Sequence, residues 1–439
     1  MKQTQQHLRG CIAVVGLALA ACSDTEEPEP PPTATCAEPT GTPVEHQGTV
    51  TSPQTWAAST PHLISANMTL SAPVTVEGCA VVRVAAGMSV AIGSGGSLIS
   101  AGSAERPVRF EPAEQGKPWG QLRISAPGSA RLSWTQLLGG GASPFADGTL
   151  YVGNSSALPG PRPLFVDHVT INGSSSPGVV LAGTTGFAEG SSELTITASG
   201  SQALPEPIAL NPNALGTLPS GVYTGNRSDA LFVSPSIASS SVFYLGQDAT
   251  LKDLGVPYRV EGLQVGNPDS QATLTLEPGV QLRFMPGKTL LIYDARSTLV
   301  ARGSTLKPIL FTSDKPTPAP GDWTGVRFEG LNANDVLDNV QVLYAGGDCQ
   351  CSSFGCNYLE GSFSVASAIL LFSPPPSSFI THSRIEHSAG HGILRGWSSS
   401  ASVSFLGSNT FSNVVGCTET TPRDMDGRCS ADPPCPKSP

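Results

Sequence analysis

Residues 274–284 read LTLEPGVQLRF, and residues 308–312 read PILFT. In both stretches short apolar runs alternate with polar residues and are bounded by proline or glycine. Alternation over about four residues is typical of a strand with one buried face, while glycine and proline mark turns. Leu282 and Phe284 should therefore face one side of a sheet and Arg283 the other. The pattern predicts short strands joined by tight turns.

The same pattern occurs twice, over residues 61–180 and 257–394. The matching segments are 82–84 with 282–284, 90–92 with 290–292, 108–110 with 309–311, 122–124 with 326–328, and 165–168 with 379–382. A long internal repeat of short apolar runs indicates stacked supersecondary units. Beyond the N-terminus, no segment keeps apolar residues at helical spacing over ten positions, so we expect an all-β fold.

This cadence resembles a known family. The motifs that carry this resemblance are residues 274–284, Gly303-Ser304, 308–312 and Gly321-Asp322-Trp323-Thr324-Gly325-Val326. These motifs are similar to those of exported bacterial right-handed parallel β-helix proteins of the pectin-lyase-like superfold, in the lipoprotein form of Gram-negative bacteria such as myxobacteria. The likeness covers 257–345 well and 61–141 more loosely. It implies an all-β, right-handed parallel β-helix built from two tandem copies, with coils of about 20–25 residues stacked about 4.8 Å apart.

The N-terminus reads as a targeting segment. Residues 1–21 combine two basic residues with a short apolar stretch, and they end before Cys22 in the tetrapeptide Leu19-Ala20-Ala21-Cys22. This tetrapeptide resembles the bacterial lipobox, which implies that Cys22 carries lipid. Ser23 follows in place of aspartate, which by the same resemblance implies sorting to the outer membrane. Whether the protein faces the periplasm or the outside stays open.

We expect five parts in the chain. They are a signal peptide at 1–21, a lipidated N-terminus and Pro/Glu-rich linker at 22–47, copy 1 at 48–245, copy 2 at 246–415, and a Cys/Pro-rich cap at 416–439. Residues 36–60, which span the end of the linker and the start of copy 1, should cap the first end of the stack, because open strand edges promote aggregation.

Eight cysteines remain after the signal peptide and Cys22. An even number in an exported chain predicts four disulfides among Cys36, Cys79, Cys349, Cys351, Cys356, Cys417, Cys429 and Cys435. Six of them lie between residues 349 and 435 and should pair among themselves, leaving Cys36 for Cys79. The alternative is a zinc site made by Cys349, Cys351 and Cys356 with a histidine. We predict no metal and no cofactor.

Composition limits the possible partners. The formal net charge is −10, and only 13% of residues are charged. Nucleic-acid binding needs clustered lysine and arginine, so the chain is not expected to bind nucleic acid. The expected contacts are the membrane, through the lipid, and a polysaccharide or another envelope protein.

Candidate ligand-binding residues are few. Trp119 and Trp323 occupy equivalent places, where they either stack on sugar rings or pack over the corner of their own coil, which we favour. A second group contains His382, Glu386, His387 and His391. On a strand over 379–387, alternation puts His387 with Ser383 and opposite His382, so these side chains do not obviously converge.

Catalytic residues are harder to find. The superfold includes lyases and hydrolases, which need a base or a carboxylate pair. The candidate carboxylates are Asp294, Asp314, Asp322, Asp335 and Asp338, and the candidate bases are Arg283, Arg296 and Arg302. Most of these aspartates neighbour Gly, Pro, Asn or Ser, as turn residues do. We therefore name no catalytic residue and expect a non-catalytic envelope or surface module that binds glycan or another envelope component. The alternatives are a carbohydrate-active enzyme and a purely structural spacer.

Overall fold

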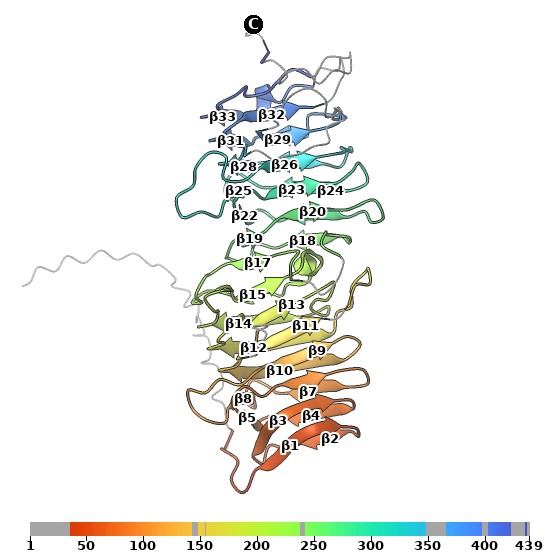
Figure 1. The fold of residues 1–439 in the computed structure, drawn as a ribbon, viewed down its shortest axis with the longest axis vertical. Coiled ribbons are helices and arrows are strands. Elements are labelled where there is room, and N and C mark those ends of the chain that lie inside the picture. Colours follow the sequence, from red (N-terminus) through yellow and green to blue (C-terminus); the bar gives the residue numbers. More distant parts are fainter. Residues whose placement is uncertain are drawn as a thin grey trace, which may run out of the picture. The chain divides into compact units, whose positions relative to one another are not determined.

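The computed structural model describes residues 36–142, 148–153, 155–237, 242–347, 366–396, 403–422 and 435–436. Contacts divide the chain between residues 33 and 34, and every described residue belongs to the second unit. This unit is all-β, and its sheets are built from parallel strand pairs (Figure 1). No helix in the described part is both long enough and apolar enough to cross a membrane.

One ladder of parallel strands continues from the first strand to the last, and we call it the long ladder. Its strands are β1 (Val44–Val50), β3 (His62–Leu70), β6 (Val90–Ile92), β9 (Leu122–Ser125), β11 (Leu150–Gly153), β13 (Val179–Leu181), β15 (Ile208–Leu210), β17 (Leu231–Val233), β19 (Tyr258–Val260), β22 (Gln281–Phe284), β25 (Ile309–Ser313), β28 (Val340–Leu343), β31 (Arg384–Glu386) and β33 (Thr410–Ser412).

The other strands of the first half belong to the same large sheet, because β3, β10 and β12 each bend at a corner and pair in two places. They are β2 (Gln54–Trp56), β4 (Pro73–Glu77), β5 (Val81–Val84), β7 (Ser97–Ala101), β8 (Val108–Pro112), β10 (Ser129–Leu138), β12 (Leu164–Asn172), β14 (Ser192–Thr197) and β16 (Gly221–Val222).

Two separate five-stranded sheets complete the second half. One contains β18 (Ala249–Leu251), β21 (Thr273–Leu276), β24 (Thr298–Arg302), β27 (Val336–Asp338) and β30 (Ile380–Thr381). The other contains β20 (Leu263–Val265), β23 (Thr289–Ile292), β26 (Gly325–Phe328), β29 (Ser367–Leu371) and β32 (His391–Arg395). The two short helical turns are η1 (Pro212–Thr217) and η2 (Leu406–Ser408).

In the second half each strand from β18 to β29 pairs with the third strand after it, as β18 does with β21, β19 with β22, and β20 with β23. The chain therefore visits three sheets in turn and returns to the first, which is a β-helix-like progression. Aligned partners lie 20 residues apart at Gly48 and Met68 and 32 apart at Val90 and Leu122. Many coils are thus longer than the expected 20–25 residues, because loops such as 113–118 lengthen the connections between strands.

The core follows the predicted alternation. Leu282 and Phe284 are fully buried whereas Arg283 is exposed, as the sequence indicates. Most buried apolar side chains form one continuous cluster from Val50 to Phe405, and a second, smaller cluster contains Tyr151, Val180, Ala182, Ala209 and Phe232. Stacking of like residues along each ladder fills the interior with Val, Ile, Leu and Phe, which is why short apolar runs suffice to build the fold.

The two halves are out of register with each other. The long ladder contains β6 from the first half, paired with β3 and β9. From the second half it contains β22, paired with β19 and β25. By sequence, however, β22 matches β5, and the counterpart of β6 is β23, which lies in another sheet. Matching segments are therefore shifted by one strand per coil, and their outward side chains face different sides.

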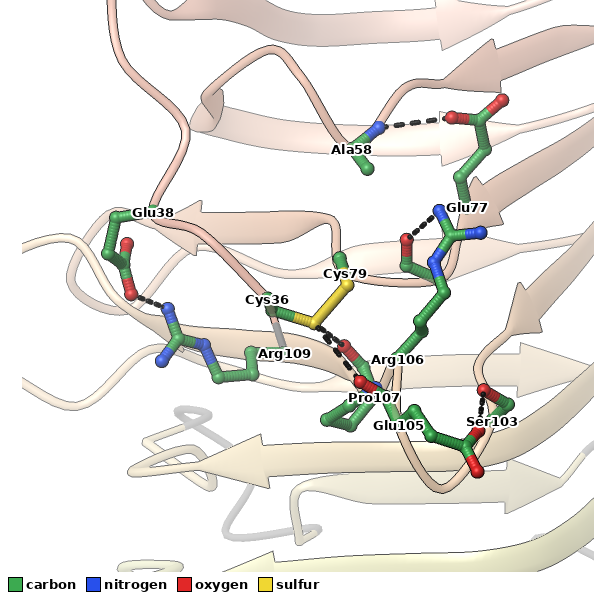
Figure 2. Close-up of a disulfide and its surroundings, with 11 residues drawn as sticks. Cys36, Glu38, Ala58, Glu77, Cys79, Ser103, Glu105, Arg106, Pro107 and Arg109 are labelled. Carbon is green, nitrogen blue, oxygen red and sulfur yellow. Dashed lines mark hydrogen bonds and ion pairs between the residues drawn. A yellow bond between two sulfur atoms is a disulfide. The ribbon is translucent and has the colours of Figure 1, made fainter. Parts of the chain in front are cut away.

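The expected first cap is not a separate element. Residues 44–50 and 54–56 form β1 and β2, which pair with β3 and β4 as an ordinary coil. The predicted disulfide between Cys36 and Cys79 is present. It holds the N-terminal segment along the side of the strands, where Glu38 contacts Arg109 (Figure 2). Glu38 also contacts Arg83 at 3.3 Å. The clamp is therefore lateral, because Cys79 lies in the turn between β4 and β5 and not at the end of the stack.

At the other end, a disulfide joins Cys417 to Cys435, in agreement with pairing inside the C-terminal cluster. The backbone of Glu419 forms a parallel β-bridge with Ile393. The buried carboxylate of Glu419 accepts hydrogen bonds from Arg395 and from the backbone N–H of Phe405. Cys22, Cys349, Cys351, Cys356 and Cys429 lie outside the described residues, as does the alternative zinc site.

Candidate functional site

The two tryptophans singled out from the sequence are core residues. Trp119 and Trp323 are fully buried. Their indole N–H groups donate to the carbonyl oxygens of Leu138 at 2.7 Å and Leu343 at 2.9 Å. The ring of Trp323 also stacks on Phe284 at 4.3 Å. Neither ring is accessible to a sugar, so the ligand-binding alternative is wrong for both, and the equivalent positions mark an interior packing motif.

His382 lies on the surface but outside a continuous strand. Its φ of 48° interrupts the expected strand over 379–387, which is divided into β30 and β31. The imidazole Nδ1 is 2.7 Å from Oδ1 of Asp338. Burial raises the pKa of Asp338, but its hydrogen bonds with His382, Thr381 and Asn339 outweigh that effect and hold the pKa below its ordinary value.

The remaining members of this group have separate partners. Glu386 accepts from Arg384 at 2.8 Å, and the ring of His387 stacks on Tyr344 with centroids 4.9 Å apart. His391 is buried, and its Nδ1 accepts from the backbone N–H of Cys417 at 3.0 Å. The structure does not bring these side chains together, and no group of three His, Cys, Asp or Glu suited to a metal exists among the residues it describes.

The candidate carboxylates have structural partners, and all lie in separate turns except Asp338, which ends β27. The nearest polar partners are Arg296 for Asp294, Arg259 for Asp314, Lys315 and Ser313 for Asp322, the backbone N–H groups of Leu299 and Asn332 for Asp335, and Thr381 and His382 for Asp338. Burial raises the pKa of Asp335 to about 6, although it accepts two backbone hydrogen bonds. These residues stabilise turns and do not form a carboxylate pair.

A different set of residues forms a cleft. Trp134, His168 and Glu193 occupy the same corner in three successive coils, and we call them the corner column. Their neighbours are paired in register, Ser133 with Asp167 and Ser192, and Thr135 with Val169 and Leu194. All three have left-handed backbones, with φ of 46°, 52° and 52°. Non-glycine residues adopt this conformation rarely, so three aligned examples mark a specialised corner.

The corner column holds its side chains in an ordered stack. The rings of Trp134 and His168 are parallel within 9° and their centroids are 3.9 Å apart. The imidazole Nδ1 of His168 is 2.8 Å from the carboxylate of Asp167, which fixes the ring. Below Trp134 the corner residue is Gly102, where a Cβ atom would lie 2.5 Å from the carbonyl oxygen of Trp134. Only glycine leaves room for that approach.

The lateral cleft beside this column has a volume of about 300 Å³. Its lining residues are Ala104, Pro107, Trp134, Gln136, His168, Thr170, Glu193 and Thr195. Gln136, Thr170 and Thr195 are aligned rungs of β10, β12 and β14, and together they make a row of amide and hydroxyl groups. With strands about 4.8 Å apart, this row is about 10 Å long. An aromatic edge beside a row of neutral hydrogen-bonding groups is the composition of a site for a hydroxyl-rich ligand.

Sequence reasoning missed this cleft. His168 is noticed only as the counterpart of His382, and position 134 is tryptophan in the first half but Asn339 in the second. The one available signal for the cleft was this difference between the halves at position 134. Trp134, His168 and Glu193 lie 34 and 25 positions apart, and their alignment depends on coil lengths that the local sequence pattern does not determine.

A second cleft, of about 490 Å³, is mostly apolar. It lies beside Phe243, whose side chain is 60% exposed, with Pro235, Leu263 and Leu291 among its lining residues.

Comparison of the chain with protein-family models, with curated proteins and with solved structures finds no match in any of the three.

Proposed function

We propose that this chain is an outer-membrane lipoprotein whose parallel sheets close into a right-handed β-helix, and that it binds a glycan in the lateral cleft without cleaving it. The observation that carries the glycan assignment is the cleft itself. It combines the Trp134–His168 stack with the aligned row of Gln136, Thr170 and Thr195.

The fold supports this proposal. Strands that return to the same sheet after two others are what a closed coil requires, and right-handed turns are the rule for parallel connections. We further propose that the halves arose as tandem copies, and that the shift of one strand per coil separated their outward faces. It would also separate the cleft at Trp134 and His168 from the matching positions Asn339 and His382.

Glycan binding fits the chemistry of the lining. Sugar rings present C–H faces that pack on aromatic rings and hydroxyls that exchange hydrogen bonds with amides and hydroxyls. The single lining carboxylate, Glu193, has no second carboxylate opposite it in the lining. A hydrolase needs such a pair, so the arrangement favours binding over hydrolysis.

The test is binding to an array of neutral, amino and acidic oligosaccharides by the whole chain and two variants. Trp134→Ala should weaken binding about tenfold, because it removes the aromatic wall. Phe243→Ala is the matched control, since Phe243 is an exposed aromatic residue outside the cleft. Equal binding by all three proteins, or release of cleaved products by the unmodified chain, would contradict the proposal.

The anchor is tested separately. A Cys22→Ser variant should lose incorporation of labelled fatty acid and leave the membrane fraction, whereas Cys22 in the unmodified chain should carry the label. Protease treatment of intact cells then distinguishes a surface-facing from a periplasmic protein. Retention of the label by Cys22→Ser would show that the lipid is attached elsewhere or that the segment is not a lipobox.

A further inference from the structure

The charges around the lateral cleft are unbalanced. Its lining contains one carboxylate, that of Glu193, and no lysine or arginine. Asp167 lies next to the cleft with its carboxylate bound to His168. If His168 is neutral, these three residues carry two negative charges; if it is protonated, they carry one. The cleft is negative in either state.

The arginines beside the lining have other partners. Arg106, next to Pro107 in sequence, donates to the carbonyl oxygen of Gly78 at 3.1 Å. Arg109 occupies the rung next to Gln136 on β8, just beyond the lining. Its guanidinium contacts Glu38 and lies 3.9 Å from Glu111, so two carboxylates surround it. The clamp of Cys36 on Cys79 keeps Glu38 in that place (Figure 2). The guanidinium of Arg109 is therefore paired with carboxylates near the N-terminal segment, and it contributes little positive potential to the cleft.

Glu193 is positioned to receive a cation. It is exposed, and pairing of Ser192 with Asp167 and of Leu194 with Val169 fixes its place at the end of the corner column. Among the described residues no hydrogen bond or ion pair engages its carboxylate, whereas Asp167 is bound to His168. A ligand about 10 Å long on the row of three rungs would bring one end beside Glu193.

We propose that the lateral cleft selects a sugar that carries a protonated amine, with the ammonium group paired to Glu193 and the ring against Trp134. This inference rests on the proposed glycan-binding function and adds the class of ligand. The same charge disfavours uronates, because a second carboxylate in the cleft would meet Glu193 without a cation between them.

The experiment compares four disaccharides by titration calorimetry with the whole chain at neutral pH. The probes are the disaccharides of glucosamine, N-acetylglucosamine, glucose and galacturonic acid. The glucosamine disaccharide should bind about fivefold more tightly than the two neutral sugars, an effect expected for a partly exposed charge pair. Raising the salt from about 20 mM to about 500 mM should remove most of that preference. The galacturonate should bind most weakly.

Two variants separate this inference from the proposed function. Glu193→Gln should equalise the affinities of the chain for the glucosamine and neutral disaccharides, because it removes the charge and keeps the size of the side chain. Glu189→Gln is the control, because Glu189 is an exposed carboxylate that precedes the same strand but does not line the cleft. Tight binding with no preference for the amine, or a preference that survives in Glu193→Gln, would overturn the inference alone. Failure of all four sugars to bind would instead overturn the glycan-binding function.

Discussion

At the scale of single residues, the first coil contains a pair of buried histidines. Nε2 of His46 is 3.0 Å from Nδ1 of His62, whose Nε2 is 3.0 Å from the carbonyl oxygen of Ala57. We assign His62 as a donor to Ala57, so its Nδ1 accepts from His46 and both rings are neutral. Trp56 stacks on His46 at 4.2 Å. Burial, assisted by the nearness of His62, lowers the pKa of His46 to about 4, and burial also lowers that of His62.

This pair makes the first coil sensitive to acid. An unfolded histidine binds a proton below about pH 6.5, but folded His46 does so only near pH 4. In that window the unfolded state binds more protons, so stability falls as the pH falls, by up to about 3 kcal/mol for His46. Urea denaturation at a series of pH values measures it. His46→Gln should flatten the dependence, whereas His382→Gln, a change at an exposed histidine, should not.

Replacing a buried tryptophan should destabilise the protein more than replacing one at the surface. Trp323→Ala removes a fully buried ring that stacks on Phe284, and it should lower the free energy of unfolding by about 3–5 kcal/mol. Trp134→Ala should cost no more than about 1 kcal/mol, because the indole is half-buried at a corner. Thermal denaturation of both variants tests this. A comparable loss in the two would mean that Trp134 is a core residue and not the wall of a cleft.

The lateral cleft is the least predictable feature at this scale. Trp119 and Trp323 recur in both halves, and recurrence marks framework residues, so their burial follows from the repeat. Trp134 does not recur. Its contact with His168 depends on the left-handed corners and on the number of residues in the intervening loop, neither of which is visible in a window of a few residues.

At the scale of elements, the corners decide where alternation holds. Within β22 the predicted inward and outward faces of Leu282, Arg283 and Phe284 are confirmed. Over 379–387 the expected single strand is wrong, because His382 takes a left-handed conformation and reverses the alternation between β30 and β31. The short apolar runs thus predict strands well, but they do not predict how strands are joined at a bend.

Glycine at a tight corner should be irreplaceable. A Cβ atom at Gly102 would lie 2.5 Å from the carbonyl oxygen of Trp134, whereas one at Gly93 would have no atom within 4 Å. Gly102→Ala should therefore destabilise the protein by about 1–3 kcal/mol and weaken ligand binding in the cleft, because Trp134 must shift. Gly93→Ala is the matched control and should be close to neutral. Equal melting temperatures for the two variants would count against the tight corner.

At the scale of the whole molecule, the disulfide between Cys36 and Cys79 fixes where the N-terminal segment is attached to the strands. Cys36 is joined to Cys79 across 43 residues of sequence, so the chain at Cys36 is held at the turn after β4. Replacing both cysteines with serine should cost about 2–4 kcal/mol and expose residues 36–43 to proteases. Limited proteolysis with mass spectrometry measures the second effect. An unchanged cleavage pattern would show that Glu38 and its arginines hold the segment without the disulfide.

The central claim is that the corner column and the row of Gln136, Thr170 and Thr195 form a glycan-binding cleft. The most direct measurement is a crystal structure of the chain with the tightest-binding disaccharide from the titrations. We predict density for the sugar against Trp134, with its polar groups on the three rungs and one end beside Glu193. Sugar bound elsewhere, as beside Phe243, or an empty cleft at saturating ligand, would contradict this account.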